Sequence, residues 1–329
     1  MTLITSQSND HLCGLNGRTG VCCAEPKTGV KAPRDRTERK LHQWTLGAAA
    51  VIAGLTLGAP QAHAALLAEE SFDYEVGDLA GHGPGNGFGG NTWSEAGLDS
   101  SNAVQVVENS LNFSSGPYTA GNRASFGTNR ERATLGLDTS PGGTFANAGL
   151  VDGSDNIGAD GTSVYISYLF QANEVKDYLG LEGYRDGARA WFLGRHGDQA
   201  EVQDGSLSDV GSFGAVNKNS EDLYVLKIDF LDGGDQITGW LSPTPGENEG
   251  SQTPDFSNVS VGDFSFDAVA MWDNAAGSPP DINFDEIRIG TTYKAVSSDT
   301  FTAVVPEPAS LALLMTGGLL MLRRRTARG

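Results

Sequence analysis

The sequence predicts an all-β domain, built as a two-sheet antiparallel sandwich of the jelly-roll kind. Three observations support this. Short apolar runs alternate with clusters of Gly, Asn, Asp, Ser and Pro, and no long stretch has the 3.6-residue period of a helix. Several runs alternate apolar and polar residues with the two-residue period of strands. Turn sequences that favour positive φ lie beside some of them, as hairpins require.

Eight segments have the composition and length of strands. In chain order these are Leu66 to Phe72, Ala103 to Val107, Ser163 to Gln171, Arg189 to Gly194, Leu223 to Leu231, Gln236 to Leu241, Phe266 to Trp272 and Ile282 to Ile289. In the third segment the even positions from Val164 to Phe170 are all apolar, and the fifth repeats this from Tyr224 to Phe230. We therefore expect one face of each strand to pack on a core and the other to be partly wet.

Turn sequences predict two hairpins. Asp232-Gly233-Gly234-Asp235 lies between two of the segments, and Tyr184-Arg185-Asp186-Gly187 precedes another. Both contain residues that adopt positive φ at low cost, so we expect tight turns there.

The last segment has a break in its alternation. Ile282 and Phe284 share one face, whereas Ile287 and Ile289 fall on the other. A β-bulge at Asp285-Glu286 would add one residue and return all four side chains to the core.

The residues before this domain have the layout of a secretory signal. An apolar run from Leu46 to Leu57 precedes Ala62, Ala64 and Ala65, where the small-x-small rule predicts cleavage after Ala64. About 12 residues at 1.5 Å each span about 18 Å, short of the roughly 30 Å hydrocarbon core, so a permanent membrane span is the weaker alternative. We interpret residues 40–64 as a signal peptide.

Residues 1–39 form an unusual N-terminal extension, because bacterial signals begin a few residues before the apolar run. One interpretation is that translation starts downstream of Met1, at Val30 or Leu41 for instance, from a non-standard start codon. The alternative is a genuine long leader, which we expect to be disordered.

The C-terminal tail has three parts. Pro306, Glu307 and Pro308 are followed by an apolar segment, Leu311 to Leu322, and then by Arg323, Arg324 and Arg325. The prolines stop any preceding element, and the arginines hold the end of a single apolar helix on the cytoplasmic side. The layout works like other tripartite anchor signals that are cut and discarded, and a chance amphipathic helix is the alternative. We therefore divide the chain into residues 65–300 as one sandwich domain and 301–329 as a sorting tail.

The order and spacing of this tail resemble the PEP-CTERM sorting signal of Gram-negative bacteria. The resemblance implies recognition of Pro306, Glu307 and Pro308 by the membrane transpeptidase exosortase, and it makes Arg323 to Arg325 the basic stop. Signal peptidase and exosortase are then the processing partners. The protein is expected at the outer surface or in the extracellular matrix, attached to the membrane through its tail before processing.

Three segments of the domain resemble the concanavalin A-like sandwich, the fold of lectin, glucanase and LamG-like domains. They are Leu66 to Tyr74, Val225 to Pro243 and Ile282 to Tyr293. The first and last match best, which fits a fold whose terminal strands often pair. Many members of that fold bind sugars or calcium, and some cleave polysaccharides.

Charge and cysteine content exclude several function classes. Residues 65–305 contain 36 Asp and Glu against 11 Lys and Arg, a formal balance of −25, so nucleic acid and anionic lipid would be repelled. Neutral polysaccharide, divalent cations or simple solubility remain compatible with that balance. Cys13, Cys22 and Cys23 all precede the signal, so the domain has no disulfide or cysteine zinc site.

A catalytic constellation is not evident. The Glu-x-Asp-x-x-Glu strand of hydrolases with this fold does not occur, and Asp285-Glu286 is only the nearest carboxylate pair, with metal binding or a structural hydrogen bond as the stronger reading. The domain has two histidines, His82 and His196, but no Gly-x-Ser-x-Gly motif whose serine they could activate as a nucleophile. We expect a protein without enzymatic activity, and a polysaccharide-cleaving enzyme on the same fold is the alternative.

Calcium is the one cofactor that the sequence suggests, because two loops gather carboxylates. The candidate ligands are Asp152, Asp155 and Asp160 in one loop, and Asp229, Asp232 and Asp235 at the other. Neither loop matches an EF-hand, and turn chemistry is the stronger alternative for both.

Carbohydrate binding requires an exposed aromatic plane beside polar side chains. Trp93, Trp191, Trp240 and Trp272 are the indoles of the domain. Trp272 ends a strand with a core pattern, so we expect it to be buried. Trp191 and Tyr184, near Arg185, Asp186 and Arg189, form the better candidate patch. Core packing is the stronger interpretation even there, and sugar binding through Trp191 is the alternative. We therefore predict an exported surface or matrix protein that binds extracellular polysaccharide.

Overall fold

The computed structural model describes residues 65–84, 86–97, 104–113, 121–127, 131–173, 178–274 and 282–298. The N-terminal extension, the signal peptide with Ala62 and Ala64, and the sorting tail lie outside these residues. Those predictions therefore remain predictions. Ala65 is the first described residue.

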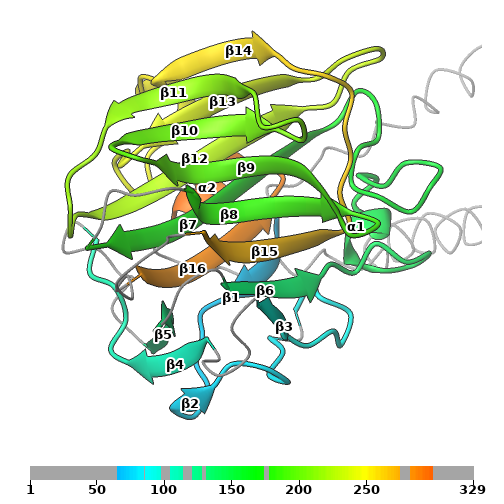
Figure 1. Ribbon diagram of the computed structural model, residues 1–329. Coiled ribbons are helices and arrows are strands. Elements are labelled where there is room, and N and C mark those ends of the chain that lie inside the picture. The colour runs from blue at the N-terminus through cyan, green and yellow to red at the C-terminus, as the bar shows by residue number, and fades with distance from the viewer. Residues whose placement is uncertain are drawn as a thin grey trace, which may run out of the picture. The chain divides into compact units, whose positions relative to one another are not determined.

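Two antiparallel sheets face each other, as the all-β prediction requires (Figure 1). The nine-stranded sheet has the order β14-β13-β12-β7-β16-β5-β4-β2, and β1 also pairs with β16. The seven-stranded sheet has the order β11-β10-β9-β8-β15-β6-β3. The fold class is thus a two-sheet sandwich.

The bounds of the strands follow here in chain order. They are β1 Leu66–Glu70, β2 Gly77–Asp78, β3 Ser94–Gly97, β4 Gln105–Glu108, β5 Asn122–Phe126, β6 Glu131–Gly136, β7 Ser163–Ala172, β8 Tyr178–Arg185, β9 Ala188–His196, β10 Gln199–Asp204, β11 Asp209–Ala215, β12 Glu221–Asp229, β13 Gln236–Leu241, β14 Phe256–Ser260, β15 Ala268–Asp273 and β16 Ile282–Gly290. The helical pieces are α1 Thr144–Asn147, α2 Tyr293–Ser297 and the 3₁₀ turn η2 Glu249–Ser251. In the described part of the chain, every helix is too short or too polar to cross a bilayer.

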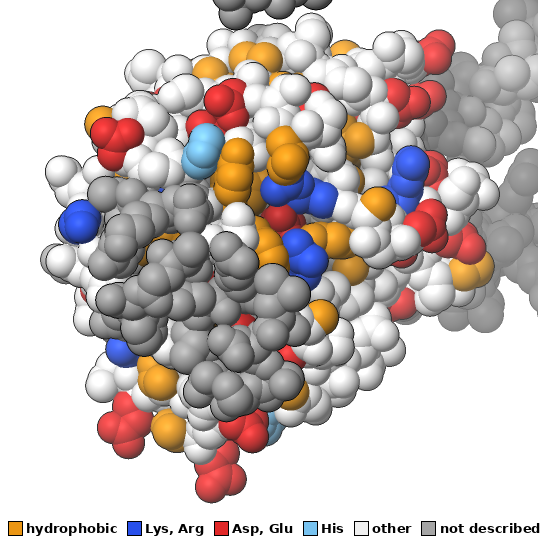
Figure 2. Space-filling model, in the orientation of Figure 1, with side chains coloured by type: hydrophobic (Ala, Val, Ile, Leu, Met, Phe, Trp, Pro, Cys, Tyr) orange, Lys and Arg blue, Asp and Glu red, His pale blue; other side chains and the backbone are white. Residues whose placement is uncertain are grey.

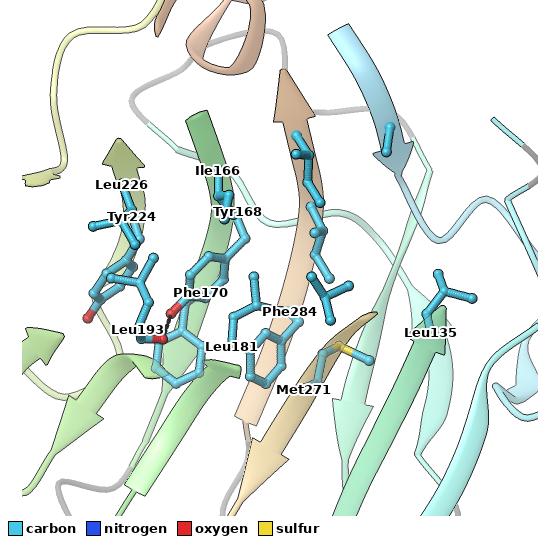
Figure 3. Close-up of a cluster of buried hydrophobic side chains, with 14 of the residues drawn as sticks. Leu135, Ile166, Tyr168, Phe170, Leu181, Leu193, Tyr224, Leu226, Met271 and Phe284 are labelled. Carbon is cyan, nitrogen blue, oxygen red and sulfur yellow. Dashed lines mark hydrogen bonds between the residues drawn. The ribbon is translucent and has the colours of Figure 1, made fainter. Parts of the chain in front are cut away.

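The main core fills the space between the sheets (Figure 3). The even-numbered apolar residues of β7, from Val164 to Phe170, all lie in it, as their alternation predicts. The rings of Tyr168 and Tyr224 stack with their centroids 5.2 Å apart, and Phe170 meets Phe284 edge-on at 5.0 Å. Each fully buried side chain of this size stabilises the fold by roughly 2 kcal/mol, so this face of β7 anchors the domain.

The other face of β7 is not partly wet, contrary to the expectation from its sequence. Tyr165 and Leu169 are buried in a second apolar cluster, together with Trp240 of β13 and Tyr293 and Val296 of α2. The short helix α2 packs against this face. A local strand pattern does not show it, because the covering residues come from the end of the domain.

Both predicted hairpins are confirmed. The turn at 232–235 joins β12 to β13, with Gly233 and Gly234 at φ of 85° and 142°. The turn at 184–187 joins β8 to β9, with Asp186 and Gly187 at φ of 52° and 78°. Positive φ at both residues of the two-residue loop 186–187 is the condition for a tight hairpin, whereas the longer loop 230–235 joins β12 to β13.

The predicted bulge in the last strand is also confirmed. The pairing of β16 with β7 shifts between Asp285 and Arg288, and Glu286 has a φ of 52°. Ile282, Phe284, Ile287 and Ile289 consequently all lie in the main core. The terminal strands β1 and β16 pair with each other, as the resemblance implied.

One carboxylate lies at the edge of the main core and pairs with no cation among the residues that the structure describes. Glu70 is 1% exposed and accepts hydrogen bonds from the Phe72 backbone N–H, the Tyr74 hydroxyl and the Trp93 indole at 2.6 to 2.8 Å. Burial raises the pKa of Glu70 above its ordinary 4.5, although these three bonds oppose the shift. Neutral donors therefore satisfy this group.

Candidate functional site

The outer face of the seven-stranded sheet carries a cluster of charged and aromatic side chains at β6, β8, β9 and β15. Residues of one strand alternate between the two faces, so Leu181 and Met271 enter the core while Glu182 and Trp272 point outward. The pairing of β15 with β6 sets Trp272 opposite Arg132. The hairpin of β8 and β9 sets Tyr184 opposite Arg189.

Glu182 is the centre of this cluster, with none of its surface exposed. Its two oxygens bind different arginines: Arg132 Nε lies 3.1 Å from Oε2, and Arg189 Nη1 lies 3.1 Å from Oε1. The Tyr184 hydroxyl donates to Oε2 at 2.8 Å. Two cations thus surround one buried anion, and the three groups together carry a net charge of +1.

Arg132 also lies between aromatic rings. Its guanidinium carbon is 4.0 Å from the centre of the Trp272 ring and 4.9 Å from that of Tyr184. Such contacts hold an arginine in place without using its N–H groups. Figure 2 shows basic side chains among apolar ones at the middle of this face.

A shallow hollow of about 360 Å³ opens over the cluster. It is lined by Arg132, Tyr178, Glu182, Tyr184, Arg189, Gly205, Leu207, Trp272 and Asn274. A second hollow of about 240 Å³ shares Arg189 and Gly205 with it and contains Arg185, Asp204 and Asp263. Together they offer aromatic surface with hydrogen-bonding groups at its edges.

The Tyr184 hydroxyl stays protonated at neutral pH. Burial and the neighbouring Glu182 carboxylate raise the pKa of Tyr184 above its ordinary value, and the two arginines oppose this only in part. Tyr184 therefore acts as a hydrogen-bond donor rather than a nucleophile.

The structure separates the residues of the predicted sugar patch. Tyr184 lines the larger hollow and Arg185 the smaller one, whereas Asp186 is exposed in the hairpin turn. Trp191 is 1% exposed and packs edge-on against Phe266 at 5.5 Å, which is the core packing that the sequence left open. Its ring has no exposed face for a sugar.

The prediction that Trp272 is buried was wrong. We expected it in the core, but it is partly exposed and lines the hollow. Both faces of β15 carry apolar residues, so alternation alone could not decide its side. Arg132 and Glu182 were not anticipated either, because no local motif connects residues that are 50 positions apart.

In each acidic loop, turn hydrogen bonds hold one carboxylate. Asp152 accepts from the backbone N–H of Ser154 and Asn156 at 2.7 and 3.0 Å, while Asp155 and Asp160 are exposed. Asp235 is buried and accepts from the N–H of Leu231 and Phe264, both at 3.0 Å. Calcium at either loop remains a prediction.

Asp229 and Asp232 do not share the hydrogen-bond partners of Asp235. Asp229 accepts from Ser163 and pairs with Lys227 Nζ at 3.0 Å, and Asp232 is exposed. Within the described residues, one group of three metal-type ligands comes within 4.8 Å, and it belongs to neither loop: His196, Glu201 and Asp209 on β9, β10 and β11. His196 Nδ1 lies 3.0 Å from Glu201, and Gln203 donates to both carboxylates.

Asp285 and Glu286, the nearest candidate for a catalytic carboxylate pair, make structural hydrogen bonds. Asp285 accepts from the backbone N–H of Leu111 and Glu286 at 3.0 and 2.8 Å, and burial raises its pKa well above the ordinary value. Glu286 binds Arg288 at 2.6 Å. These bonds stabilise the bulge in β16.

No family model and no curated protein sequence matches this chain. Similar solved structures include domain 4 of AbnA, a GH43 extracellular arabinanase from Geobacillus stearothermophilus, in complex with arabinotriose. It is 14% identical with a TM-score of 0.40, and 70% of this chain and 93% of that chain are covered.

Two further matches have lower sequence identity to this chain. The receptor binding domain of botulinum neurotoxin type G is 10% identical with a TM-score of 0.41, covering 71% of this chain and 49% of that one. Trypanosoma rangeli sialidase, in complex with the inhibitor DANA, is 13% identical with a TM-score of 0.33, covering 61% and 30%. Likeness at this level concerns the sandwich fold alone and leaves the ligand of this chain to be argued from its own residues.

Proposed function

We propose that this protein is a non-catalytic carbohydrate-binding protein, exported to the cell surface or the extracellular matrix. The observation that carries the binding role is the hollow on the outer face of the seven-stranded sheet, where Trp272 and Tyr184 supply aromatic surface. Arg132, Arg189 and Asn274 supply hydrogen-bonding groups at its edge. Aromatic surface flanked by fixed polar groups is what a sugar ring and its hydroxyls require.

The carboxylate of the hollow supports a role without catalysis. Glycoside hydrolysis uses two carboxyl groups, one of them free to exchange a proton. Glu182 is the single carboxylate among the described residues that line the larger hollow, and two arginines and Tyr184 bind it. A polysaccharide-cleaving activity would need a second acid there.

The binding role is tested with a glycan array, probed with the full chain in calcium and in chelator. We expect retention of at least one extracellular polysaccharide, and loss of that retention in Trp272→Ala while this variant remains folded. Trp272→Phe keeps an aromatic ring and is the matched control. Equal retention by Trp272→Ala and the parent chain would contradict the proposal, and a chelator effect would favour calcium at the acidic loops.

The sorting role rests on the tail sequence. Exosortase would recognise Pro306, Glu307 and Pro308, and Arg323 to Arg325 would hold the tail in the membrane until processing. Replacing the three residues 306–308 by alanine should leave an unprocessed precursor in the membrane fraction. Normal processing of that variant would argue against exosortase, and it would leave the carbohydrate-binding role untouched.

A further inference from the structure

Charge within the larger hollow runs against the charge of the domain. Residues 65–305 carry a formal balance of −25, yet two of their 11 basic residues, Arg132 and Arg189, line this hollow beside one acid. The adjoining hollow contains Arg185 together with Asp204 and Asp263, so the positive balance is confined to the larger hollow. A locally positive site in such an acidic domain suggests that the site binds an anionic group.

The pairing with Glu182 leaves other N–H groups of Arg132 and Arg189 available to a ligand. Each guanidinium gives a single N–H to Glu182, from Arg132 Nε and Arg189 Nη1. Arg189 Nη2 is buried and has no hydrogen-bond partner among the described residues. Leaving a buried donor without a partner is unfavourable, so a ligand oxygen that reaches this guanidinium would form a strong charge-assisted bond.

On this basis, and resting on the proposed function, we propose that the hollow binds an acidic sugar, with a uronic acid carboxylate on Arg132 and Arg189. A carboxylate matches the planar fork of a guanidinium, and the sugar ring would lie against the aromatic surface of Trp272 and Tyr184. Arg132 is fixed by its two ring contacts, so little side-chain freedom is lost on binding.

The overall acidity of the domain sets the form of the ligand. A long polyanion is repelled by the many surface carboxylates, whereas a short acidic segment is governed by the groups next to it. At physiological salt, charges beyond about 8 Å are largely screened. We therefore expect recognition of single uronic acid residues or short runs of them.

The test compares three oligosaccharides of equal length on the full chain: an oligouronate, the same oligosaccharide with its carboxyl groups reduced to alcohols, and a sulfated analogue. We expect the oligouronate to bind about tenfold more tightly than the reduced form, which is one charge-assisted hydrogen bond. Arg132→Gln and Arg189→Gln should each abolish that preference. Lys218→Gln removes an exposed positive charge away from both hollows and should leave the preference intact.

A second variant keeps the test valid if the arginine variants fail to fold. Glu182→Gln preserves the shape of the group but removes the competing anion, so it should tighten oligouronate binding. Weaker binding by Glu182→Gln would overturn the inference.

The outcomes separate the two proposals. Equal binding of the uronate and its reduced form overturns the acidic-sugar inference and leaves the carbohydrate-binding role standing. Tighter binding of the sulfated analogue than of the uronate overturns the carboxylate assignment. Binding of none of the three, with an empty glycan array, overturns both.

Discussion

Trp191 and Trp272 lie on opposite faces of the same seven-stranded sheet. Trp191 on β9 points inward, 1% exposed, and meets Phe266 edge-on. Trp272 on β15 points outward, with the Arg132 guanidinium 4.0 Å from its ring centre. The sequence predicted a buried Trp272 and left Trp191 open between core packing and a sugar patch, so only the position of Trp272 was wrong. The difference teaches that the side of the sheet, and not the polarity of the neighbouring residues, decides whether an indole is buried or partly exposed.

Replacing the inner tryptophan should have the largest effect on stability. We expect Trp191→Ala to lower the free energy of unfolding by about 4 kcal/mol, because it leaves a large cavity in the main core. Urea denaturation followed by circular dichroism measures this. Trp191→Phe, which retains a ring, should lose less. A loss below about 1 kcal/mol for Trp191→Ala would mean that the indole is not part of the core and would break the comparison.

Removing the central carboxylate of the charged cluster on the outer face should have the second-largest effect on stability. Glu182→Ala leaves two arginines without their counter-charge, so we expect a loss of about 2 kcal/mol in the same measurement. Glu182→Gln keeps hydrogen-bond acceptors and should cost less. If both variants are as stable as the parent chain, Glu182 does not organise the arginines.

Glu70 sharpens the comparison of Glu182 with another buried carboxylate, since neutral donors bind Glu70 whereas arginines bind Glu182. Its raised pKa means that the folded state holds the proton more tightly than the unfolded state. The contribution of Glu70 to stability is therefore greatest at low pH and falls as pH rises through its folded pKa.

Melting temperatures from pH 4 to pH 8 would check this for the parent chain and Glu70→Gln, which cannot titrate. We expect the melting temperature of Glu70→Gln to gain on that of the parent as pH rises above the ordinary value of 4.5. A constant difference across the range would contradict a raised pKa.

The outer tryptophan should have the smallest effect on stability. Trp272→Ala removes the contact with Arg132 and some partly exposed surface, so we expect a loss of about 1 kcal/mol or less in the free energy of unfolding. Thermal denaturation measures it. A loss as large as that of Trp191→Ala would show that Trp272 is a core residue after all.

Much of the fold could be predicted from local patterns. Alternation identified β7 and β12, turn residues identified two hairpins, and the break at Asp285-Glu286 identified a bulge. The sequence did not predict strand β8, because its glycines look like turn residues. They are instead steric requirements: a Cβ at Gly183 would lie 2.1 Å from Trp191 Nε1, and Gly180 faces Gly194 across the β8–β9 pair.

The candidate site was less predictable for the same physical reason. Tyr184 was identified because it lies beside other polar and aromatic residues in the chain. Arg132 and Trp272 join it only through the pairing of β15 with β6 and β8, which brings together residues far apart in sequence. Local patterns show which residues alternate but not which strands become neighbours.

The most direct test of the account is the glycan binding of Trp272→Ala beside that of Trp191→Phe, each corrected for the folded fraction. The account predicts that Trp272→Ala loses binding while remaining folded, and that Trp191→Phe binds like the parent chain. Retained binding by Trp272→Ala, together with loss in Trp191→Phe, would place the sugar site elsewhere and contradict the assignment of the outer face.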